Sequence, residues 1–499
     1  TAFGIRTSDF RADTGYWLNG RNIKIKGVVL YQDGGALGEA VPSAVWEYRL
    51  RLLKGIGVNA IRWASNPPSP ELLDLCDRLG FLVVDELFDS WAVAQPTAEM
   101  GYNRYFNQWS NSDLRDTVLR DRNHPSVILY SAGNQIRDIF DATQSKGILT
   151  NLVRLFHQYD PTRPVTMAML NQVANRDIDD NLADLLDIIG ANYHDPDLLD
   201  AHNAKPSRKI INTGEYVAAV HWLLVRDNPP FAGQFVWAGI DYLGEANWPN
   251  TTNPSGLFDR MGQPKASAQQ RRSLWVDDPP FVALARLESV IEANGRRNQV
   301  GIFDWNPTNP EKQTVVAYTN AQHVELFLNG KSLGILSSEP DNPPTWKINY
   351  EPGELKAVAI IDGKSVATDS LVSAGAPTKV VLTLDNSKSS LLPGDFDHVA
   401  IVTATISDES GVRCATTGDL ITFSVDGPGY IVAVDNADIS SHESYQASQR
   451  YAYNGRCLVI LRASTAASPN DPITLSASVN GLQNGKLILH ASTPIASGI

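Results

Sequence analysis

The chain has 499 residues, with 42 basic and 55 acidic side chains and a formal net charge of −13. An acidic chain without a basic cluster is a poor partner for nucleic acid or for an anionic membrane. No apolar run approaches the roughly 18 residues of a membrane-spanning helix. The three cysteines, Cys76, Cys414 and Cys457, are too few for a disulfide-dense scaffold.

From residue 22 to residue 275, short apolar runs alternate with stretches of helical periodicity. Strands are expected at 22–30, 59–64, 81–87, 127–134, 165–169, 188–193, 209–214 and 232–239. Helices are expected at 43–56, 70–79, 112–122, 146–159, 181–187, 217–226 and 265–275, with the helix after the sixth strand weak or missing. Eight such repeats predict a (β/α)₈ TIM barrel, for which about 250 residues are typical. An open doubly wound sheet is the alternative, but Gly34-Gly35 is not the GxGxxG turn that it would carry.

After about residue 278 the helical periodicity gives way to short alternating strands. Asn329-Gly330 and Asp362-Gly363 are typical two-residue hairpin turns. We therefore expect a multidomain chain in which two all-β immunoglobulin-like sandwiches follow the barrel. The expected domains are a remnant of a preceding β-sandwich with its linker over 1–20, the barrel over 21–278, and sandwiches over 279–375 and 376–499.

Function in such a barrel gathers at the carboxyl ends of the strands. The residues expected there are mostly aromatic, amide-bearing or acidic: Tyr31, Asp33, Arg62, Asn134, Gln135, Tyr193, His194, Glu215, Trp237 and Asp241. This composition suits a sugar, because aromatic faces stack on its C–H surfaces and polar groups fix its hydroxyls. The sequence contains no HExxH or CxxC motif, and these strand ends carry no GxSxG nucleophile elbow, so no metal centre or serine nucleophile is predicted.

Hydrolysis of a glycosidic bond needs two carboxyl groups that flank the bond. Glu215, at the end of the seventh predicted strand, is one candidate. Its partner would be expected at position 135, after the fourth strand, and that position is Gln. Arg62 is expected in the site or as a buried ion-pair partner of Asp85 or Glu86.

Many ordered segments carry a family resemblance. They include KIKGV at 24–28, GVNAIR at 57–62, LDLCDRLGFLVVDE at 73–86, RDRNHPSVIL at 120–129, GNQ at 133–135, GQFVWAGIDYLGE at 233–245, VELFLNGKSLG at 324–334 and ITFSVDGPGYIVAVDNAD at 421–438. The chain thereby resembles glycoside hydrolase family 2, and within it the bacterial β-galactosidase-like members with extra C-terminal β domains. The opening FGIRT resembles the last strand of the family's immunoglobulin-like domain, so the N-terminal sugar-binding domain would be missing from this chain.

The resemblance implies a role for each matching residue. Glu215 resembles the nucleophile, Tyr193 its hydrogen-bond partner, and Asn134 the amide that reads the substrate 2-hydroxyl. Arg62 resembles the arginine packed beneath the nucleophile, and Trp237 the aromatic floor of the sugar subsite. The other expected substrate contacts are Asp33, His194, Asp241 and Trp275.

Gln135 stands where the family has its acid/base glutamate, and a carboxamide cannot exchange a proton as a carboxylic acid does. Tyr31, Ser65, Tyr130 and Ala132 also depart from the residues usual in the family. Such a cluster indicates an altered sugar subsite. Gln135 itself is explained either by an introduced change or by a natural variant.

We therefore expect a retaining exo-β-glycosidase of β-galactosidase type that acts on oligosaccharides or polysaccharides, with little activity because of Gln135. The alternatives are a glycan-binding pseudoenzyme, a glycosidase for another sugar such as a β-uronide, and a scaffold with partner-binding sandwiches. No cofactor is expected; some family members bind Mg²⁺, but this sequence shows no specific ligand set. The missing N-terminal domains are a candidate partner if they exist as a separate chain.

Overall fold

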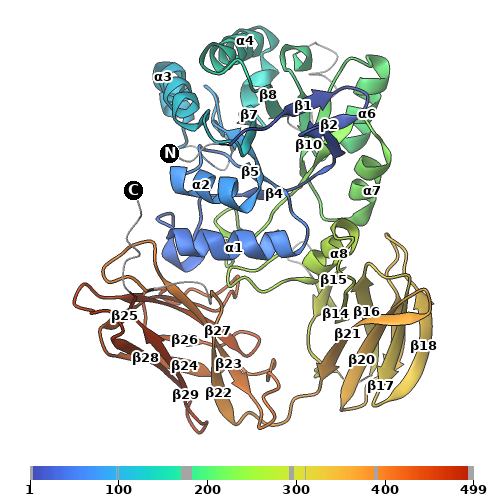
Figure 1. The fold of residues 1–499 in the computed structure, drawn as a ribbon, viewed down its shortest axis with the longest axis vertical. Coiled ribbons are helices and arrows are strands. Elements are labelled where there is room, and N and C mark those ends of the chain that lie inside the picture. Colours follow the sequence, from blue (N-terminus) through green and yellow to red (C-terminus); the bar gives the residue numbers. More distant parts are fainter. Residues whose placement is uncertain are drawn as a thin grey trace. The chain divides into compact units, whose positions relative to one another are not determined.

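The computed structural model describes residues 4–96, 98, 100–169, 182–291, 297–309, 311–386 and 391–492. The chain divides into two compact units. The first unit runs from the N-terminus to Gln32 and continues over Leu53–Gly239, and the second comprises Asp33–Leu52 and the chain from Ile240 onward. Figure 1 shows their helices and strands, coloured along the sequence. In the described part of the chain, no helix has both the length and the apolar character to cross a bilayer.

Eight parallel strands of the first unit close into a barrel, as predicted. They are β4 (Ile25–Leu30), β5 (Ala60–Trp63), β6 (Leu82–Glu86), β7 (Val127–Asn134), β8 (Val165–Met169), β9 (Ile189–Asn192), β10 (Ile210–Glu215) and β11 (Phe231–Val236). Their order around the barrel follows the chain, and β11 pairs with β4 to close it. Every residue of β5 to β11 is buried, which explains their almost continuous apolar sequences.

Helices follow most of these strands. They are α1 (Ser43–Gly55), α2 (Pro70–Leu79), α3 (Asn103–Asp121), α4 (Ala142–Tyr159), α6 (Asp195–Ala204), α7 (Ala219–Asp227) and α8 (Ala266–Trp275), with 3₁₀ turns η1 (Gly35–Leu37), η2 (Arg137–Phe140) and η3 (Ala183–Leu185). The expectation of a weak or missing helix after the sixth strand is wrong. A proline in its first turn and two acidic residues at its amino end favour α6. The helix expected at 181–187 is only the turn η3, and residue 181 lies outside the described residues.

Local capping explains why α2 has the bounds that the sequence predicts. The Ser69 hydroxyl accepts a hydrogen bond from the Leu72 amide at 3.3 Å, and Pro70 occupies the first turn. Gly80 ends the helix in the left-handed conformation, with φ 73°, and its amide donates to the Cys76 carbonyl. Each of these devices satisfies or removes a backbone group that a helix end leaves unpaired.

A small antiparallel sheet packs against the amino ends of the barrel strands. It contains β1 (Ser8–Arg11), β2 (Gly15–Leu18) and β3 (Arg21–Ile23). Phe10 and Tyr16 share one buried cluster with Ile25, Leu82 and Ala232, which lie at or next to the starts of β4, β6 and β11. The amino end of the barrel is therefore closed by apolar side chains.

The sequence also predicts a strand over residues 3–7, and this prediction is wrong for its described part. Residues 4–7 carry no strand, and residue 3 lies outside the described residues. The Arg6 guanidinium instead donates to the carbonyls of Pro125 and Val127, at the start of β7. At the other end of the segment, Thr7 exchanges two hydrogen bonds with Asn19, which lies between β2 and β3, at 2.9 and 3.0 Å.

The second unit is rich in antiparallel sheets. A two-stranded sheet joins β12 (Tyr242–Leu243) to β13 (Thr252–Asn253). The next sheet contains β14 (Val282–Ile291), β15 (Arg297–Ile302), β16 (Lys312–Thr319) and β19 (Thr345–Asn349). The sheet after it contains β17 (His323–Leu328), β18 (Lys331–Ser337), β20 (Glu354–Ile361) and β21 (Lys364–Val372). Asn329 and Gly330, with φ of 50° and 79°, form the predicted turn between β17 and β18, and Asp362 and Gly363 repeat it between β20 and β21.

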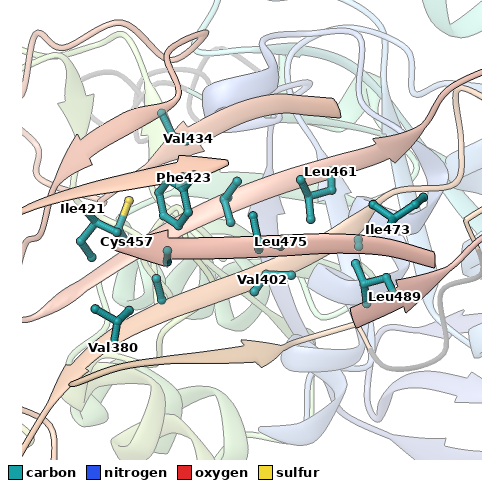
Figure 2. Close-up of a cluster of buried hydrophobic side chains, with 14 of the residues drawn as sticks. Val380, Val402, Ile421, Phe423, Val434, Cys457, Leu461, Ile473, Leu475 and Leu489 are labelled. Atoms are coloured by element: carbon teal, nitrogen blue, oxygen red, sulfur yellow. The ribbon is translucent and has the colours of Figure 1, made fainter. Parts of the chain in front are cut away.

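The last two sheets pack face to face around one core. The first contains β22 (Lys379–Leu384), β23 (Ala400–Ser407), β27 (Arg456–Ala463) and β25 (Gly429–Asp435). The second contains β26 (Gln449–Tyr451), β24 (Leu420–Asp426), β28 (Pro472–Ser478) and β29 (Gly485–His490). Figure 2 shows Val402 and Leu461 of the first sheet beside Phe423 and Leu475 of the second. This packing is that of a β-sandwich. The domain boundaries expected from the sequence stay predictions.

Candidate active site

Most of the polar residues predicted for the site lie at the carboxyl ends of the barrel strands. Arg62 is on β5, Asn134 ends β7, and Glu215 ends β10. Gln135, Tyr193 and Trp237 directly follow β7, β9 and β11. The chain thus places six predicted residues on one end of the barrel, opposite the end that the small sheet closes.

Arg62 is the centre of a buried hydrogen-bond network. Its guanidinium donates to both Glu86 carboxylate oxygens at 2.8 and 2.9 Å. It also donates to the Asn134 side-chain oxygen at 2.9 Å, the Asn192 side-chain oxygen at 3.2 Å and the Thr213 carbonyl at 2.7 Å. Arg62 and Glu86 are both fully buried, so their charges cancel within the barrel. Of the two partners left open by the sequence, Glu86 is the one that Arg62 binds.

This network fixes the orientation of the Asn134 carboxamide. Its oxygen accepts from Arg62 and, at 3.1 Å, from the Asn192 amide group. Among the described residues, none accepts a hydrogen bond from its nitrogen. Burial raises the pKa of Glu86, although the Arg62 guanidinium and the Ser131 hydroxyl, which donates at 2.7 Å, act in the other direction.

Glu215 is fully buried and has no guanidinium or ammonium partner among the described residues. One carboxylate oxygen accepts from the Asn212 side chain at 3.0 Å, and the other accepts from the Tyr216 amide at 2.8 Å. Burial, and next the charge of Asp195, raise the pKa of Glu215 to about 7. The Tyr216 amide and His221, whose Nδ1 lies 3.6 Å from Glu215, oppose that shift.

Asp195, Asn212 and His221 were not singled out from the sequence. The Asn212 amide group donates to the carboxylates of both Asp195 and Glu215, and His221 Nδ1 lies 3.1 Å from Asp195. The Asp195-Pro196 pair is a helix-start signal that could have located Asp195. Asn212 within a buried strand and His221 within a helix give no signal of their own.

Two clusters bring three metal-ligand side chains within 4.8 Å of one another: Asp195 with Glu215 and His221, and Asp74 with Asp77 and His124. The second already has protein partners, because Asp77 bonds to His124 at 2.7 Å and to the Ser126 amide at 2.8 Å. In the first, Asn212 bridges the two carboxylates. The absence of a metal cofactor stays a prediction.

Tyr193 and Trp237 lie on either side of Glu215 along the barrel rim. The Tyr193 amide donates to the Gly214 carbonyl at 2.8 Å, and its ring lies 4.5 Å from that of Tyr216. The Trp237 amide donates to the Glu215 carbonyl at 2.9 Å, and its ring meets Tyr31 edge to face at 5.6 Å. Two aromatic surfaces therefore flank the strand end that carries Glu215.

Gln135 follows β7 in a left-handed backbone conformation, with φ 49°. Its amide donates to the Ala168 carbonyl at 2.7 Å, and its carbonyl accepts from the Gln95 side chain at 3.1 Å. A non-glycine residue at positive φ persists only where neighbours hold it. These two bonds provide that support and fix where the half-buried Gln135 side chain begins.

The other four predicted residues have partners of their own. His194 precedes α6 and is paired with Asp197. In the second unit, Asp33 accepts from the Leu243 amide at 2.8 Å, and Asp241 accepts from Lys265 at 2.6 Å. Trp275 is 2 % exposed and packs on Arg271. Their predicted substrate contacts stay predictions.

A parallel barrel of eight strands with polar side chains at its carboxyl end belongs to the TIM barrels, which place their active sites there. The family model for the "Glycosyl hydrolases family 2, TIM barrel domain" matches residues 12–222, and that for the "Glycoside hydrolase family 2 C-terminal domain 5" matches residues 382–488. Residues 311–367 match a domain of unknown function.

Solved structures agree with these matches. A β-glycosidase from Bacteroides vulgatus is 31 % identical, with a TM-score of 0.85 over 98 % of this chain and 67 % of that one. A family 2 glycosyl hydrolase from Bacteroides cellulosilyticus is 31 % identical, with a TM-score of 0.90 over 98 % of this chain and 65 % of that one. The chain belongs to glycoside hydrolase family 2.

Two curated relatives carry different activities in their names. The β-galactosidase BoGH2A of Bacteroides ovatus is 33 % identical over 93 % of this chain and 61 % of its own length. A putative β-glucuronidase of Formosa agariphila is 28 % identical over 96 % of this chain and 50 % of its own length. The chain spans about half to two thirds of the length of these relatives.

Proposed function

We propose that the chain carries the catalytic barrel of a retaining exo-β-glycosidase of β-galactosidase type, with Glu215 as the nucleophile. The observation that carries this proposal is the environment of Glu215: a buried carboxylate at a barrel strand end, held by two N–H donors and unpaired with Lys or Arg in the described chain. A carboxylate positioned in this way is pre-organised to attack, and its negative charge is not neutralised by an ion pair.

In the proposed reaction, Glu215 attacks the anomeric carbon and forms a glycosyl-enzyme while the bond to the leaving oxygen breaks. Asn134, whose oxygen is already bound by Arg62 and Asn192, offers its N–H₂ group to a substrate hydroxyl. Trp237 supplies an aromatic surface for the sugar ring, and Tyr193 is proposed to hydrogen-bond Glu215. In this proposal Arg62 positions Asn134 and does not itself contact the substrate.

Gln135 takes the place of the group that protonates the leaving oxygen and later activates water. A carboxamide does neither, so we propose that natural glycosides are turned over slowly. Leaving groups that depart as stable anions need little protonation, and their glycosylation step survives best. The glycosyl-enzyme then persists because no carboxylate at position 135 activates water.

The sugar is proposed to be neutral. The Arg62 guanidinium is already neutralised by Glu86, so it is not available to a substrate carboxylate. The resemblance to the named β-galactosidase over 93 % of the chain points the same way. A β-uronidase is the second candidate, because the Formosa relative named as a putative β-glucuronidase matches 96 % of the chain.

The test compares the chain with its Gln135→Glu variant on aryl β-galactosides and aryl β-glucuronides. We expect a gain of about 10² or more, the usual scale of general acid–base help, on the galactosides. Glu215→Gln in the same background is the control and should remove the gain. No gain on any sugar would support a glycan-binding protein without catalysis, and a gain on glucuronides alone would make the chain a β-uronidase.

A further inference from the structure

A cavity of about 400 Å³ lies in the first unit, beside the carboxyl ends of β5 and β6 and along α3. This volume is within the range of small-molecule sites, about 300–1,000 Å³. Loops after the two strands form one wall and α3 the other. The residues that carry the argument are Asp89, Phe88, Tyr102, Asp113, Thr117 and Arg120.

The cavity adjoins the strand end that carries Asn134 and Gln135. The Asn134 amide donates to the Phe88 carbonyl at 3.1 Å. The Gln95 side chain donates to the carbonyls of Asp89, Asn134 and Gln135, at 2.9, 3.1 and 3.1 Å. Hydrogen bonds thus join the wall of the cavity to Asn134 and Gln135, at the end of the fourth barrel strand. Glu215 lies at the end of the seventh barrel strand, so the cavity is on the acid/base side of the site.

The lining combines aromatic surface with negative charge. Phe88 and Tyr102 stack with ring centroids 5.4 Å apart, and the Tyr102 hydroxyl donates to Asp113 at 2.6 Å. Asp89 and Asp116 add two further carboxylates, of which Asp116 is paired with Arg115 at 2.8 Å. The guanidinium of Arg120 is already bound to both Asp121 oxygens, at 2.6 and 2.7 Å. The cavity therefore presents hydrogen-bond acceptors and a net negative charge.

We propose that this cavity receives the leaving-group sugar of the substrate and selects a neutral or cationic sugar over an anionic one. The inference rests on the proposed function, because position 135 faces the leaving oxygen in a retaining glycosidase. Hydroxyl or ammonium groups of the sugar donate to the carboxylates, and the C–H face of the ring stacks on the aromatic pair. An anionic sugar meets like charge in a partly buried site, where repulsion is strong.

The test uses three β-1,4-linked probes that share a galactosyl unit: lactose, galactosyl-glucosamine and galactosyl-glucuronate, whose second units are neutral, cationic and anionic pyranose rings. Calorimetric titration of the unaltered chain gives each Kd, because Gln135 keeps turnover slow. We expect galactosyl-glucuronate to bind at least about ten-fold more weakly than the other two. Asp113→Asn should narrow that difference, since it removes one negative charge without changing the shape of the lining.

A steric variant tests the location. Thr117→Trp places a large ring into the cavity from α3, and the matched control Leu119→Trp adds the same ring to the exposed side of that helix. Thr117→Trp should weaken lactose binding at least about ten-fold more than galactose binding. Leu119→Trp should change neither affinity, and equal melting temperatures for the two variants exclude misfolding.

Equal lactose affinity in both tryptophan variants, equal affinity for the three probes, or no probe binding at all would each overturn the inference. The proposed function is read separately, by covalent labelling of Glu215 with dinitrophenyl 2-deoxy-2-fluoro-β-galactoside, whose aryl group does not need a sugar-binding cavity. Labelling with unchanged lactose binding in Thr117→Trp retains the function and rejects the cavity. Loss of labelling with charge-selective lactose binding rejects the function and retains a glycan site.

Discussion

Glu86 and Glu215 are both fully buried at the carboxyl end of the same barrel, yet their surroundings treat the negative charge in opposite ways. Glu86 meets Arg62 and the Ser131 hydroxyl, which neutralise and bind it. Glu215 meets a second buried carboxylate, Asp195, and an amide that the two share. The comparison teaches that burial alone does not identify a nucleophile: Arg62 neutralises Glu86, whereas Glu215, the proposed nucleophile, has no Lys or Arg partner among the described residues.

The largest effect is expected from removing Glu215, the proposed nucleophile. Glu215→Gln keeps the shape and loses the nucleophile, so labelling by the fluoro-galactoside should fall by a factor on the order of 10⁴ or more. Mass spectrometry of the labelled peptide measures the effect. A label that persists on another residue of the variant would show that the nucleophile lies elsewhere.

Breaking the buried Arg62–Glu86 ion pair should destabilise the folded protein. Arg62→Met leaves Glu86 buried without its partner, which costs about 3–5 kcal/mol in comparable buried pairs. Hydrogen exchange of the β5 and β6 amides measures the local opening free energy. A loss below about 1 kcal/mol would mean that the pair does not anchor the barrel, and the double variant Arg62→Met with Glu86→Leu should recover part of the loss.

Unlike Arg62→Met, Glu215→Gln should increase the free energy of unfolding at neutral and alkaline pH. The folded-state pKa of Glu215 is raised from 4.5 to about 7, so the folded protein favours the protonated form. The destabilisation by its charge is absent below pH 4.5, grows as the pH rises, and is complete above about 7. The variant should therefore match the unaltered chain at pH 4.5 and exceed it by up to about 3 kcal/mol at pH 8, at 1.36 kcal/mol for each pH unit. Urea unfolding at both pH values measures this difference.

The pH dependence of labelling should have one ionisation, because the Gln135 carboxamide does not titrate. The rate should rise with a midpoint near pH 7, as Glu215 becomes charged. Asp195→Asn removes a neighbouring negative charge and should lower that midpoint, whereas His221→Gln removes an opposing contribution and should raise it. If both substitutions moved the midpoint in the same direction, the electrostatic account of Glu215 would be wrong.

The smallest effect is expected from an exposed ion pair, which serves as the reference for Arg62. Arg51 and Glu47 pair across one turn of α1, and their side chains are 45 % and 30 % exposed to solvent. Arg51→Ala should cost about 0.3–0.5 kcal/mol, in the range of surface helix pairs. A cost as large as that of Arg62→Met would show that burial is not the source of the difference.

The barrel could be predicted because its information is local. Buried parallel strands are continuous apolar runs, and β7 and β8 have the bounds that the sequence predicts. The helix α6 was underestimated because its apolar periodicity is weak, although Pro196 and the acidic first turn favour it. For α6, the proline and the acidic residues of the first turn indicate a helix that the apolar periodicity does not.

The site could be predicted only in part. The rule that function lies at strand ends located Glu215, Asn134 and Arg62 without any knowledge of their contacts. Which carboxylate Arg62 binds depends on the direction in which Asp85 and Glu86 point, and successive strand residues point to opposite sides. The Asn212 bridge between Asp195 and Glu215 joins α6 to β10, two elements whose packing no spacing in the sequence records.

The small sheet at the amino end of the barrel limits the route by which a glycan can enter and leave. Phe10 and Tyr16 seal that end, and the barrel interior is packed with side chains, so the barrel has no passage along its axis. If the proposed function holds, a glycan that enters at the carboxyl end of the barrel must also leave there, and each cleavage would require a new encounter with a chain end.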